Sequence, residues 1–165
     1  MTFTLQNIIP VIDAKLVKNL PEFSIENISI DSRSLQNNQG TLFFALKGHN
    51  HDAHQYLQNL IDKGVRFFVV EYIPEHLKDK AHFIVVKNTL NALQQTAIFY
   101  RNLFSFPTIG ITGSNGKTIV KEWLNFLLSP DFTIVRSPKS YNSQVGVPGS
   151  LILYGKSIGS ATNAS

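Results

Sequence analysis

Cysteine is absent from this sequence, which excludes disulfide bonds, thiolate metal sites and cysteine nucleophiles. No apolar run approaches the roughly 18 residues of a membrane-spanning helix, and the first residues do not resemble a secretion signal. The formal charge is only +4 and the lysines are scattered, which disfavours nucleic acid as a partner. These absences predict a soluble, cytoplasmic protein.

The length and composition predict a globular chain with two α/β parts. Its 165 residues are many for one average domain and few for two, and 43% of them are hydrophobic. We predict a substrate-binding first domain over residues 1–86, a linker helix over 87–106, and the start of a second domain over 107–148. Residues 149–165 form a tail that is either a natural flexible terminus or derived from cloning or truncation.

The first part is predicted to be a small mixed α/β domain. Ile28 and Ile30 alternate with polar neighbours, and residues 41–46, 67–70 and 82–86 are predicted to be buried strands. The residues expected on one helical face, with the glycine expected to end that helix, are Ala53, Leu57, Leu60, Ile61 and Gly64. Asn88 is predicted to cap the linker helix. This part has too few glycine fingerprints to bind a dinucleotide.

A glycine-rich loop lies between residues 107 and 118, where the chain reads PTIGITGSNGKT. In such a loop, glycines let backbone N–H groups turn towards one anion, a lysine reaches the outer phosphates, and a hydroxyl ligates Mg²⁺. The standard pattern G-x-x-x-x-G-K-[ST] requires glycine at position 111, where this chain has Ile111. Residues 112–118 nevertheless keep the spacing of a tight phosphate turn, so we predict a nucleoside triphosphate site.

The residues around this loop support the interpretation. Residues 108–112 are predicted to form a buried strand and residues 132–135 the next strand. Between them, one face of a helix is predicted from the recurrence of Val120, Leu124, Leu127 and Leu128. The positive end of that helix would contribute to the same site. The alternative is a structural turn that binds nothing, but such a turn does not need Lys-Thr directly after its last glycine.

Residues 30–33 (IDSR), 40–48 (GTLFFALKG) and 110–118 (GITGSNGKT) occur in this order along the chain. Together they resemble the Mur ligases, the ATP-dependent amide-forming enzymes of peptidoglycan precursor synthesis. The resemblance extends from about residue 25 to residue 148. It implies a small mixed α/β domain, followed by the opening βαβ part of a P-loop parallel-sheet domain.

Within the family, residues 137–148 (SPKSYNSQVGVP) are most similar to the member that adds D-alanyl-D-alanine to UDP-N-acetylmuramoyl tripeptide. They are particularly similar to the form of that ligase fused to an alanine racemase. The resemblance therefore implies the amino-terminal fragment of a carboxylate–amine ligase, with the UDP-muramoyl peptide and D-alanyl-D-alanine as small-molecule substrates. Two other ligases of the family, which add a diamino acid or D-glutamate, remain alternatives.

The resemblance also implies a site for the uridine diphosphate end of the substrate. The residues carried over to it are Ile30, Ser32, His49, Asn50, His51 and Asn142. A uracil and a ribose need short hydroxyl and amide partners, which a polar loop after a buried strand supplies. Alternatively, residues 31–33 form a turn stabilised by their own side chains, and Asn142 is a loop asparagine that bonds the backbone. A metal site in the histidine-rich loop around residues 49–54 is disfavoured by the spacing.

For the second domain, the resemblance implies ATP and Mg²⁺ as cofactors. The ATP-binding residues would be Gly113, Ser114, Asn115, Gly116, Lys117, Thr118 and Ile119. Lys117 would act in catalysis by neutralising the transferring phosphoryl group, and Thr118 would ligate Mg²⁺. Family members activate the substrate carboxylate as an acyl phosphate, and an amine then displaces phosphate.

Carboxylates are missing from the end of the chain, where no Asp or Glu follows Asp131. Phosphoryl transfer with Mg²⁺ normally needs a further carboxylate on the metal, and the family's later lysine, histidine and third domain have no counterpart in this sequence. We therefore predict that this chain alone is catalytically inactive. Two further alternatives are a P-loop module that binds nucleotide without ligase activity, and a binding domain whose glycine loop is only structural.

Overall fold

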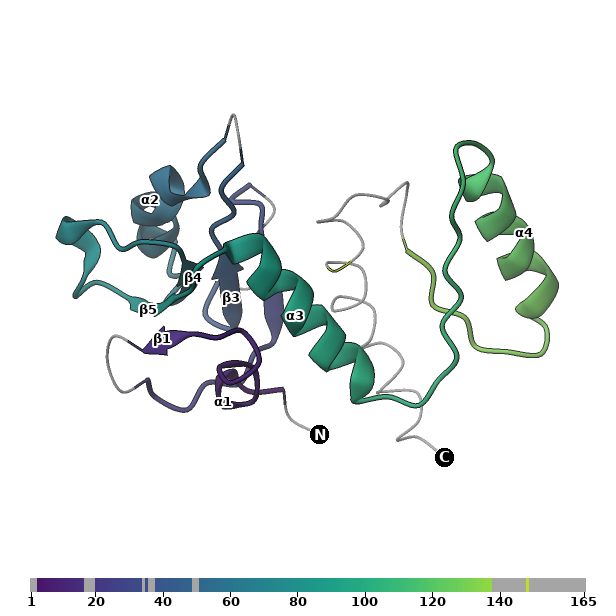
Figure 1. The fold of residues 1–165 in the computed structure, drawn as a ribbon, viewed down its shortest axis with the longest axis horizontal. Coiled ribbons are helices and arrows are strands. Elements are labelled where there is room, and N and C mark those ends of the chain that lie inside the picture. Colours follow the sequence, from purple (N-terminus) through teal and green to yellow (C-terminus); the bar gives the residue numbers. More distant parts are fainter. Residues whose placement is uncertain are drawn as a thin grey trace. The chain divides into compact units, whose positions relative to one another are not determined.

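The computed structural model describes residues 3–16, 20–33, 35, 38–48, 51–137 and 148. The chain divides into two compact units, Met1–Phe99 and Tyr100–Ser165. No helix in the described ranges is long and apolar enough to cross a membrane. Figure 1 shows the helices and strands of each unit.

The first unit is built around a five-stranded sheet with the order β1-β5-β4-β3-β2. Four neighbouring strands, β2 to β5, run parallel, and β1 pairs with β5 in the antiparallel sense. The strands are β1 (Lys15–Leu16), β2 (Asn27–Ser29), β3 (Thr41–Phe44), β4 (Phe67–Val70) and β5 (His82–Val85). This confirms the α/β class and the strands predicted around residues 41–46, 67–70 and 82–86.

Helical segments precede, connect and follow these strands. They are α1 (Leu5–Ile8), the 3-10 turn η1 (Ala53–Tyr56), α2 (Leu57–Asp62), the 3-10 turn η2 (Glu75–Leu77) and α3 (Thr89–Asn102). The predicted stop at Gly64 is confirmed: its φ of +97° is one that side-chain-bearing residues rarely adopt, and its N–H donates to the Ile61 carbonyl at 2.9 Å. The predicted cap of α3 is also confirmed, because Asn88 Oδ1 accepts the Asn91 N–H at 2.8 Å.

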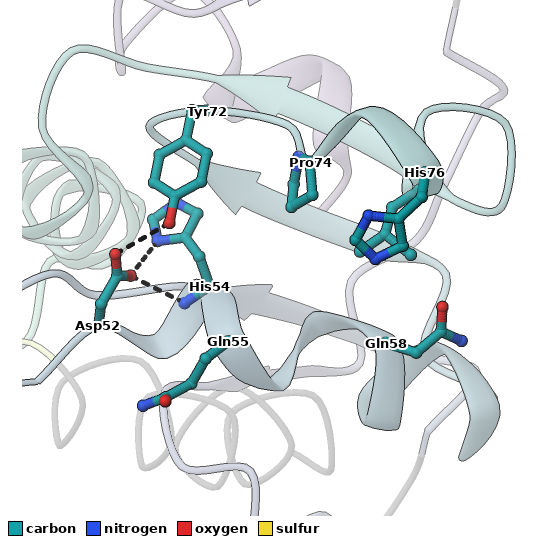
Figure 2. A pocket seen from close by; sticks show the side chains of 8 residues that line it. Asp52, His54, Gln55, Gln58, Tyr72, Pro74 and His76 are labelled. Carbon is teal, nitrogen blue, oxygen red and sulfur yellow. Dashed lines mark hydrogen bonds and ion pairs between the residues drawn. The ribbon is translucent and has the colours of Figure 1, made fainter.

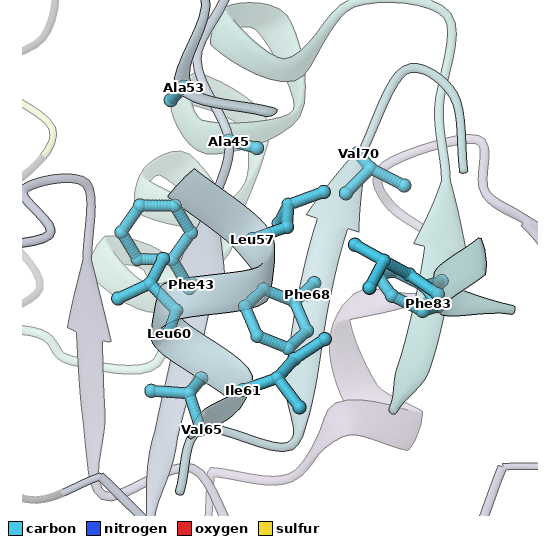
Figure 3. Close-up of a cluster of buried hydrophobic side chains, with 11 residues drawn as sticks. Phe43, Ala45, Ala53, Leu57, Leu60, Ile61, Val65, Phe68, Val70 and Phe83 are labelled. Carbon is cyan, nitrogen blue, oxygen red and sulfur yellow. The ribbon is translucent and has the colours of Figure 1, made fainter. Parts of the chain in front are cut away.

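The core of the first unit lies between α2 and one face of the sheet. Figure 3 shows Leu57, Leu60 and Ile61 of α2 packed towards Phe43 and Phe68, which lie on neighbouring strands. β3 and β4 are buried at every position, as expected for parallel strands that are covered on both faces. This explains why the sequence shows continuous apolar runs there instead of alternation.

Gly40 is required by the close approach of two chain segments just before β3. A Cβ atom at this position would lie 2.8 Å from the Glu26 Cβ and 2.6 Å from its Oε2. The backbone of the same two segments is joined at the Gly40 carbonyl, which accepts the N–H groups of Glu26 and Asn27 at 3.0 and 3.1 Å. The absence of a side chain at Gly40 therefore allows the segment before β3 to pack against the segment before β2.

The second unit contains helix α4 (Lys117–Leu128). The strands predicted at residues 108–112 and 132–135 are not formed: both segments are without regular structure, and Ile109 and Phe132 are each 64% exposed. A strand is stabilised by hydrogen bonds to a neighbour, and no strand partner for these segments lies in the described part of this unit. Residues 136–137 are instead tied to α4, through an Arg136–Glu122 ion pair and a hydrogen bond from Lys121 Nζ to the Ser137 carbonyl at 3.0 Å.

Candidate functional site

The carboxyl ends of the parallel strands gather several of the predicted site residues at one edge of the sheet. Ile30 and Ser32 follow β2, and His51 lies in the loop that follows β3. β2 and β3 are direct neighbours, with Ser29 opposite Phe43. Ligands of open α/β sheets bind outside the carboxyl ends of their strands, so this edge is the candidate site of the first unit.

After β2 the chain forms a tight turn held by Asp31 and Arg33. Asp31 Oδ1 accepts the Arg33 backbone N–H and the Arg33 Nε–H, each at 2.9 Å, and Oδ2 accepts from Nη2 at 2.9 Å. These bonds, the side-chain bond first, lower the pKa of Asp31 to about 2. The turn stabilised by its own side chains, considered above as an alternative, is therefore formed. A nucleotide contact by the intervening, partly buried Ser32 stays a prediction.

The loop after β3 is closed by its own backbone. Lys47 and Asp52 form an antiparallel bridge, and the Gly48 N–H donates to the His51 carbonyl at 2.7 Å. The His51 side chain is exposed, and its ring lies 5.6 Å from that of Tyr56. The other predicted residues of this loop, His49 and Asn50, lie outside the described residues, as does Asn142.

Sequence reasoning missed a hydrogen-bonded cluster of Asp52, His54 and Tyr72, which Figure 2 shows. His54 Nδ1 lies 2.5 Å from Asp52 Oδ1, and the Tyr72 hydroxyl donates to Asp52 Oδ2 at 3.0 Å. The rings of His54 and Tyr72 stack at 4.2 Å with an interplanar angle of 11°. The sequence signal for the Asp52–His54 pair was a histidine two residues after an aspartate at the start of a helical turn. Tyr72 had no such signal, because it follows β4 and is distant in the sequence.

The hydrogen bonds of His54 define the protonation of its buried ring. Nε2 accepts the backbone N–H of Glu71 at 3.0 Å, so this nitrogen carries no proton. The proton therefore sits on Nδ1 and is donated to Asp52. Both ring nitrogens are used within the protein, and the side chain is only 1% exposed. His54 is thus a structural link between the loop after β3 and the end of β4.

The same contacts set the ionisation of Asp52 and Tyr72. Burial raises the pKa of Asp52, but the hydrogen bonds from the His54 backbone, the His54 ring and the Tyr72 hydroxyl outweigh it, so the pKa lies below the usual value. Burial and the bond to Asp52 raise the pKa of Tyr72. At neutral pH, Asp52 is therefore a carboxylate and Tyr72 keeps its proton.

A small cavity of about 230 Å³ opens beside this cluster. Its walls come from η1, α2, η2 and the segment after β4, and are formed by Asp52, His54, Gln55, Gln58, Tyr72, Pro74, His76 and Leu77. Its volume is below the roughly 300–1,000 Å³ of typical ligand pockets. The polar groups of Asp52 and His54 are already paired with the protein. We therefore assign the cavity no ligand.

The glycine-rich loop of the second unit, residues 110–118, which we call the phosphate loop, contains two glycines with positive φ angles. Gly113 has a φ of +140° and Gly116 a φ of +78°, values at which other residues are strained. Gly116 immediately precedes α4, and the Lys117 ammonium bonds back to the loop carbonyls of Gly113 and, at 3.3 Å, Ser114. The first turn of a helix has backbone N–H groups without intrahelical partners. The loop therefore combines an ammonium group with N–H donors, a set suited to anionic oxygens.

Comparisons with known proteins identify the family of this chain. Residues 24–101 match the Mur ligase family, catalytic domain. The UDP-N-acetylmuramoyl-tripeptide–D-alanyl-D-alanine ligase of Synechocystis sp. is 36% identical over 137 residues, which cover 82% of this chain and 30% of that protein. The chain belongs to the Mur ligase family.

Solved Mur ligase structures share the fold. MurF from Acinetobacter baumannii superimposes with a TM-score of 0.83 at 29% identity, over 92% of this chain and 33% of that one. MurF from Thermotoga maritima in complex with ADP gives a TM-score of 0.67 at 26% identity, over 76% of this chain and 28% of that one. The chain thus spans between 28% and 33% of the length of the three relatives.

Proposed function

We propose that this Mur ligase chain serves an ATP-dependent carboxylate–amine ligase that adds D-alanyl-D-alanine to a UDP-N-acetylmuramoyl tripeptide. The observation that carries the proposal is the similarity to the Synechocystis ligase of that name, which extends over 82% of this chain. The similarity of the structure to two MurF enzymes supports it. The names of these relatives mention no racemase, so a fusion to alanine racemase stays a prediction.

In this proposal the first unit binds the uridine diphosphate end of the substrate at the carboxyl edge of its sheet. Ile30, Ser32 and the loop His49-Asn50-His51 contact the nucleotide. Support comes from the neighbouring positions of β2 and β3, after which these residues follow. Asn142, in the second unit, is proposed to face the substrate.

The second unit binds ATP and Mg²⁺ through its phosphate loop. The donor set fits such a ligand: Lys117 supplies a positive charge, Thr118 an exposed hydroxyl, and the turn at Gly116 the backbone N–H groups at the start of α4. Gly113, Ser114, Asn115 and Ile119 complete the proposed ATP contacts. Bound ATP would supply the phosphoryl group that activates the substrate carboxylate. Lys117 would neutralise charge on that group, and Thr118 would ligate Mg²⁺.

Separate calorimetric titrations with UDP and with ATP·Mg²⁺ test the two sites. We expect both nucleotides to bind the intact chain. Lys117→Ala should abolish ATP binding and leave UDP binding unchanged, while Lys63→Ala, an exposed lysine of the first unit, should change neither. Tight ATP or GTP binding without any UDP binding would favour a P-loop module of another class. Binding of neither nucleotide to the folded chain would refute the proposal.

Turnover is a separate question, because no Asp or Glu follows Asp131 to complete a Mg²⁺ site. We expect no phosphate release when this chain alone is incubated with ATP, Mg²⁺, UDP-muramoyl tripeptide and D-alanyl-D-alanine. Release well above background would contradict that expectation. In the same assay, turnover with a diamino acid or D-glutamate and its matching UDP-muramoyl acceptor would favour another ligase of the family.

A further inference from the structure

Lys47 stands at the carboxyl edge of the sheet without a carboxylate partner in the described part of the chain. It follows β3 and is exposed. Its backbone pairs with that of Asp52 across the loop, but the Asp52 carboxylate is directed to His54 and Tyr72 instead. The Lys47 ammonium lies over the ring of Tyr72, 5.9 Å from its centroid.

Two contacts within the protein fix the Tyr72 ring. Its hydroxyl donates to Asp52 at 3.0 Å, and its face stacks on the buried ring of His54 at 4.2 Å. An ammonium within about 6 Å of an aromatic centroid is attracted by the ring. This contact attracts the Lys47 ammonium to the ring without neutralising its charge.

The acidic groups nearby are already supplied with donors. Asp52 accepts from the His54 backbone, the His54 ring and the Tyr72 hydroxyl. Glu71 Oε1 accepts the N–H and the hydroxyl of Thr89 at 3.0 and 3.2 Å. Neither carboxylate forms an ion pair with Lys47, so the ammonium stays available for an external anion.

We propose that Lys47 binds the diphosphate of the uridine nucleotide and that Tyr72, fixed by Asp52 and His54, is the positioning residue for its ammonium. The inference rests on the proposed UDP site and adds a subsite that the sequence did not assign. Ser32 and Lys47 follow neighbouring parallel strands, and in the proposed arrangement a nucleoside held after β2 has its phosphates at the loop after β3. A lysine ammonium serves as a point charge for phosphate oxygens.

The test compares UDP with uridine, which lacks the phosphates, by calorimetry on the intact chain. The unmodified protein should bind UDP more tightly than uridine. Lys47→Ala should weaken UDP binding by about tenfold or more and leave uridine binding unchanged, and Lys47→Arg should restore most of the loss. Lys63→Ala is the matched control and should change neither affinity.

Two variants of Tyr72 separate positioning from folding. Tyr72→Leu removes the aromatic face and should weaken UDP binding about two- to fivefold without affecting uridine. Tyr72→Phe keeps the face and should bind UDP nearly as well as the unmodified protein. Added salt should weaken UDP binding less in Lys47→Ala than in the unmodified protein.

The outcomes distinguish this inference from the function on which it rests. If the protein binds both ligands but Lys47→Ala retains the full preference for UDP, the inference is overturned while the nucleotide site stands. Equal losses for UDP and uridine would make Lys47 a structural residue and would also overturn it. If Tyr72→Phe is as weak as Lys47→Ala, the aromatic face does not position the ammonium. Binding of neither ligand would refute the proposed function, and this inference with it.

Discussion

Replacing His54 by alanine tests the hydrogen-bonded link between the loop after β3 and the end of β4. The side chain is 1% exposed, accepts the Glu71 N–H through Nε2 and donates to Asp52 through Nδ1. A buried N–H left without a partner costs about 1–3 kcal/mol, and the lost stacking on Tyr72 about 0.5–1.5 kcal/mol more. We therefore expect His54→Ala to reduce the free energy of unfolding by about 1.5–4.5 kcal/mol, a large share of the stability of an ordinary domain.

Urea unfolding followed by far-UV circular dichroism measures the overall loss. Hydrogen exchange measured by NMR localises it, and is preferable to fluorescence because the one tryptophan, Trp123, lies in the second unit. The Glu71 amide should exchange much faster in His54→Ala. His76→Ala is the matched control, because it lines the same cavity with an exposed side chain and should cost less than about 0.5 kcal/mol.

Two results would refute this reasoning. One is an unchanged exchange rate at Glu71 in His54→Ala, which would mean that Nε2 is not the acceptor of that N–H. The other is a loss of stability no larger than that of His76→Ala. Nitrogen-15 NMR of the unmodified protein offers an independent check, because the geometry requires the proton on Nδ1 of His54 and not on Nε2.

Three further predictions concern other elements of the chain. Gly40→Ala should destabilise the first unit by about 1–3 kcal/mol in urea unfolding, because the new Cβ would lie 2.8 Å from the Glu26 Cβ. Gly48→Ala is the control, because its Cβ would lie 3.7 Å from the His51 carbonyl oxygen, an ordinary contact; an equal effect of the two substitutions would exclude this cause. The Asp31 carboxyl should titrate at a pKa of about 2, and in Arg33→Ala this value should rise towards 3.8 because the hydrogen bonds from the Arg33 side chain are lost. The pKa of Asp31 is lower in the folded than in the unfolded chain, so its stabilising contribution is present above pH 3.8 and is lost as the pH falls towards about 2. NMR titration of the Asp31 carboxyl carbon measures this pKa. An unchanged titration midpoint in Arg33→Ala would count against the Asp31–Arg33 pairing. Asn88→Ala should cost about 1 kcal/mol by removing the side-chain cap of α3, and a neutral result in thermal unfolding would show that the cap contributes nothing in solution.

Strands β3, β4 and β5 were predictable because each contains at least three consecutive apolar residues. β3 and β4 are buried at every position, so no choice of sheet face was needed to recognise them. Gly64 was equally clear as the end of a helix, since its positive φ suits glycine. The strands predicted around Ile109 and at residues 132–135 were wrong for the complementary reason: an apolar run becomes a strand only when a neighbouring strand accepts its hydrogen bonds.

The candidate site was predictable in part. The turn at residues 31–33 and the phosphate loop depend on local spacing, and the structure forms the turn and gives Gly113 and Gly116 the positive φ values of a tight loop. The cluster around His54 was not predictable from spacing, because Tyr72 and the Glu71 N–H reach it from another strand. A pattern search compares nearby residues, whereas these partners are about twenty positions apart in the sequence.

By itself, the sequence determined the α/β class, the strands β3 to β5, the caps of two helices and the presence of a glycine loop followed by Lys117. Each of these depends on local conformational preference or on the hydrophobic period, which are properties of short segments. Only the tertiary structure decided that Asp52, His54 and Tyr72 meet, and that Lys47 lies over an aromatic ring instead of pairing with a carboxylate. The physical reason is the parallel pairing of β3 and β4, which brings the residues after each strand to one edge regardless of their separation along the chain.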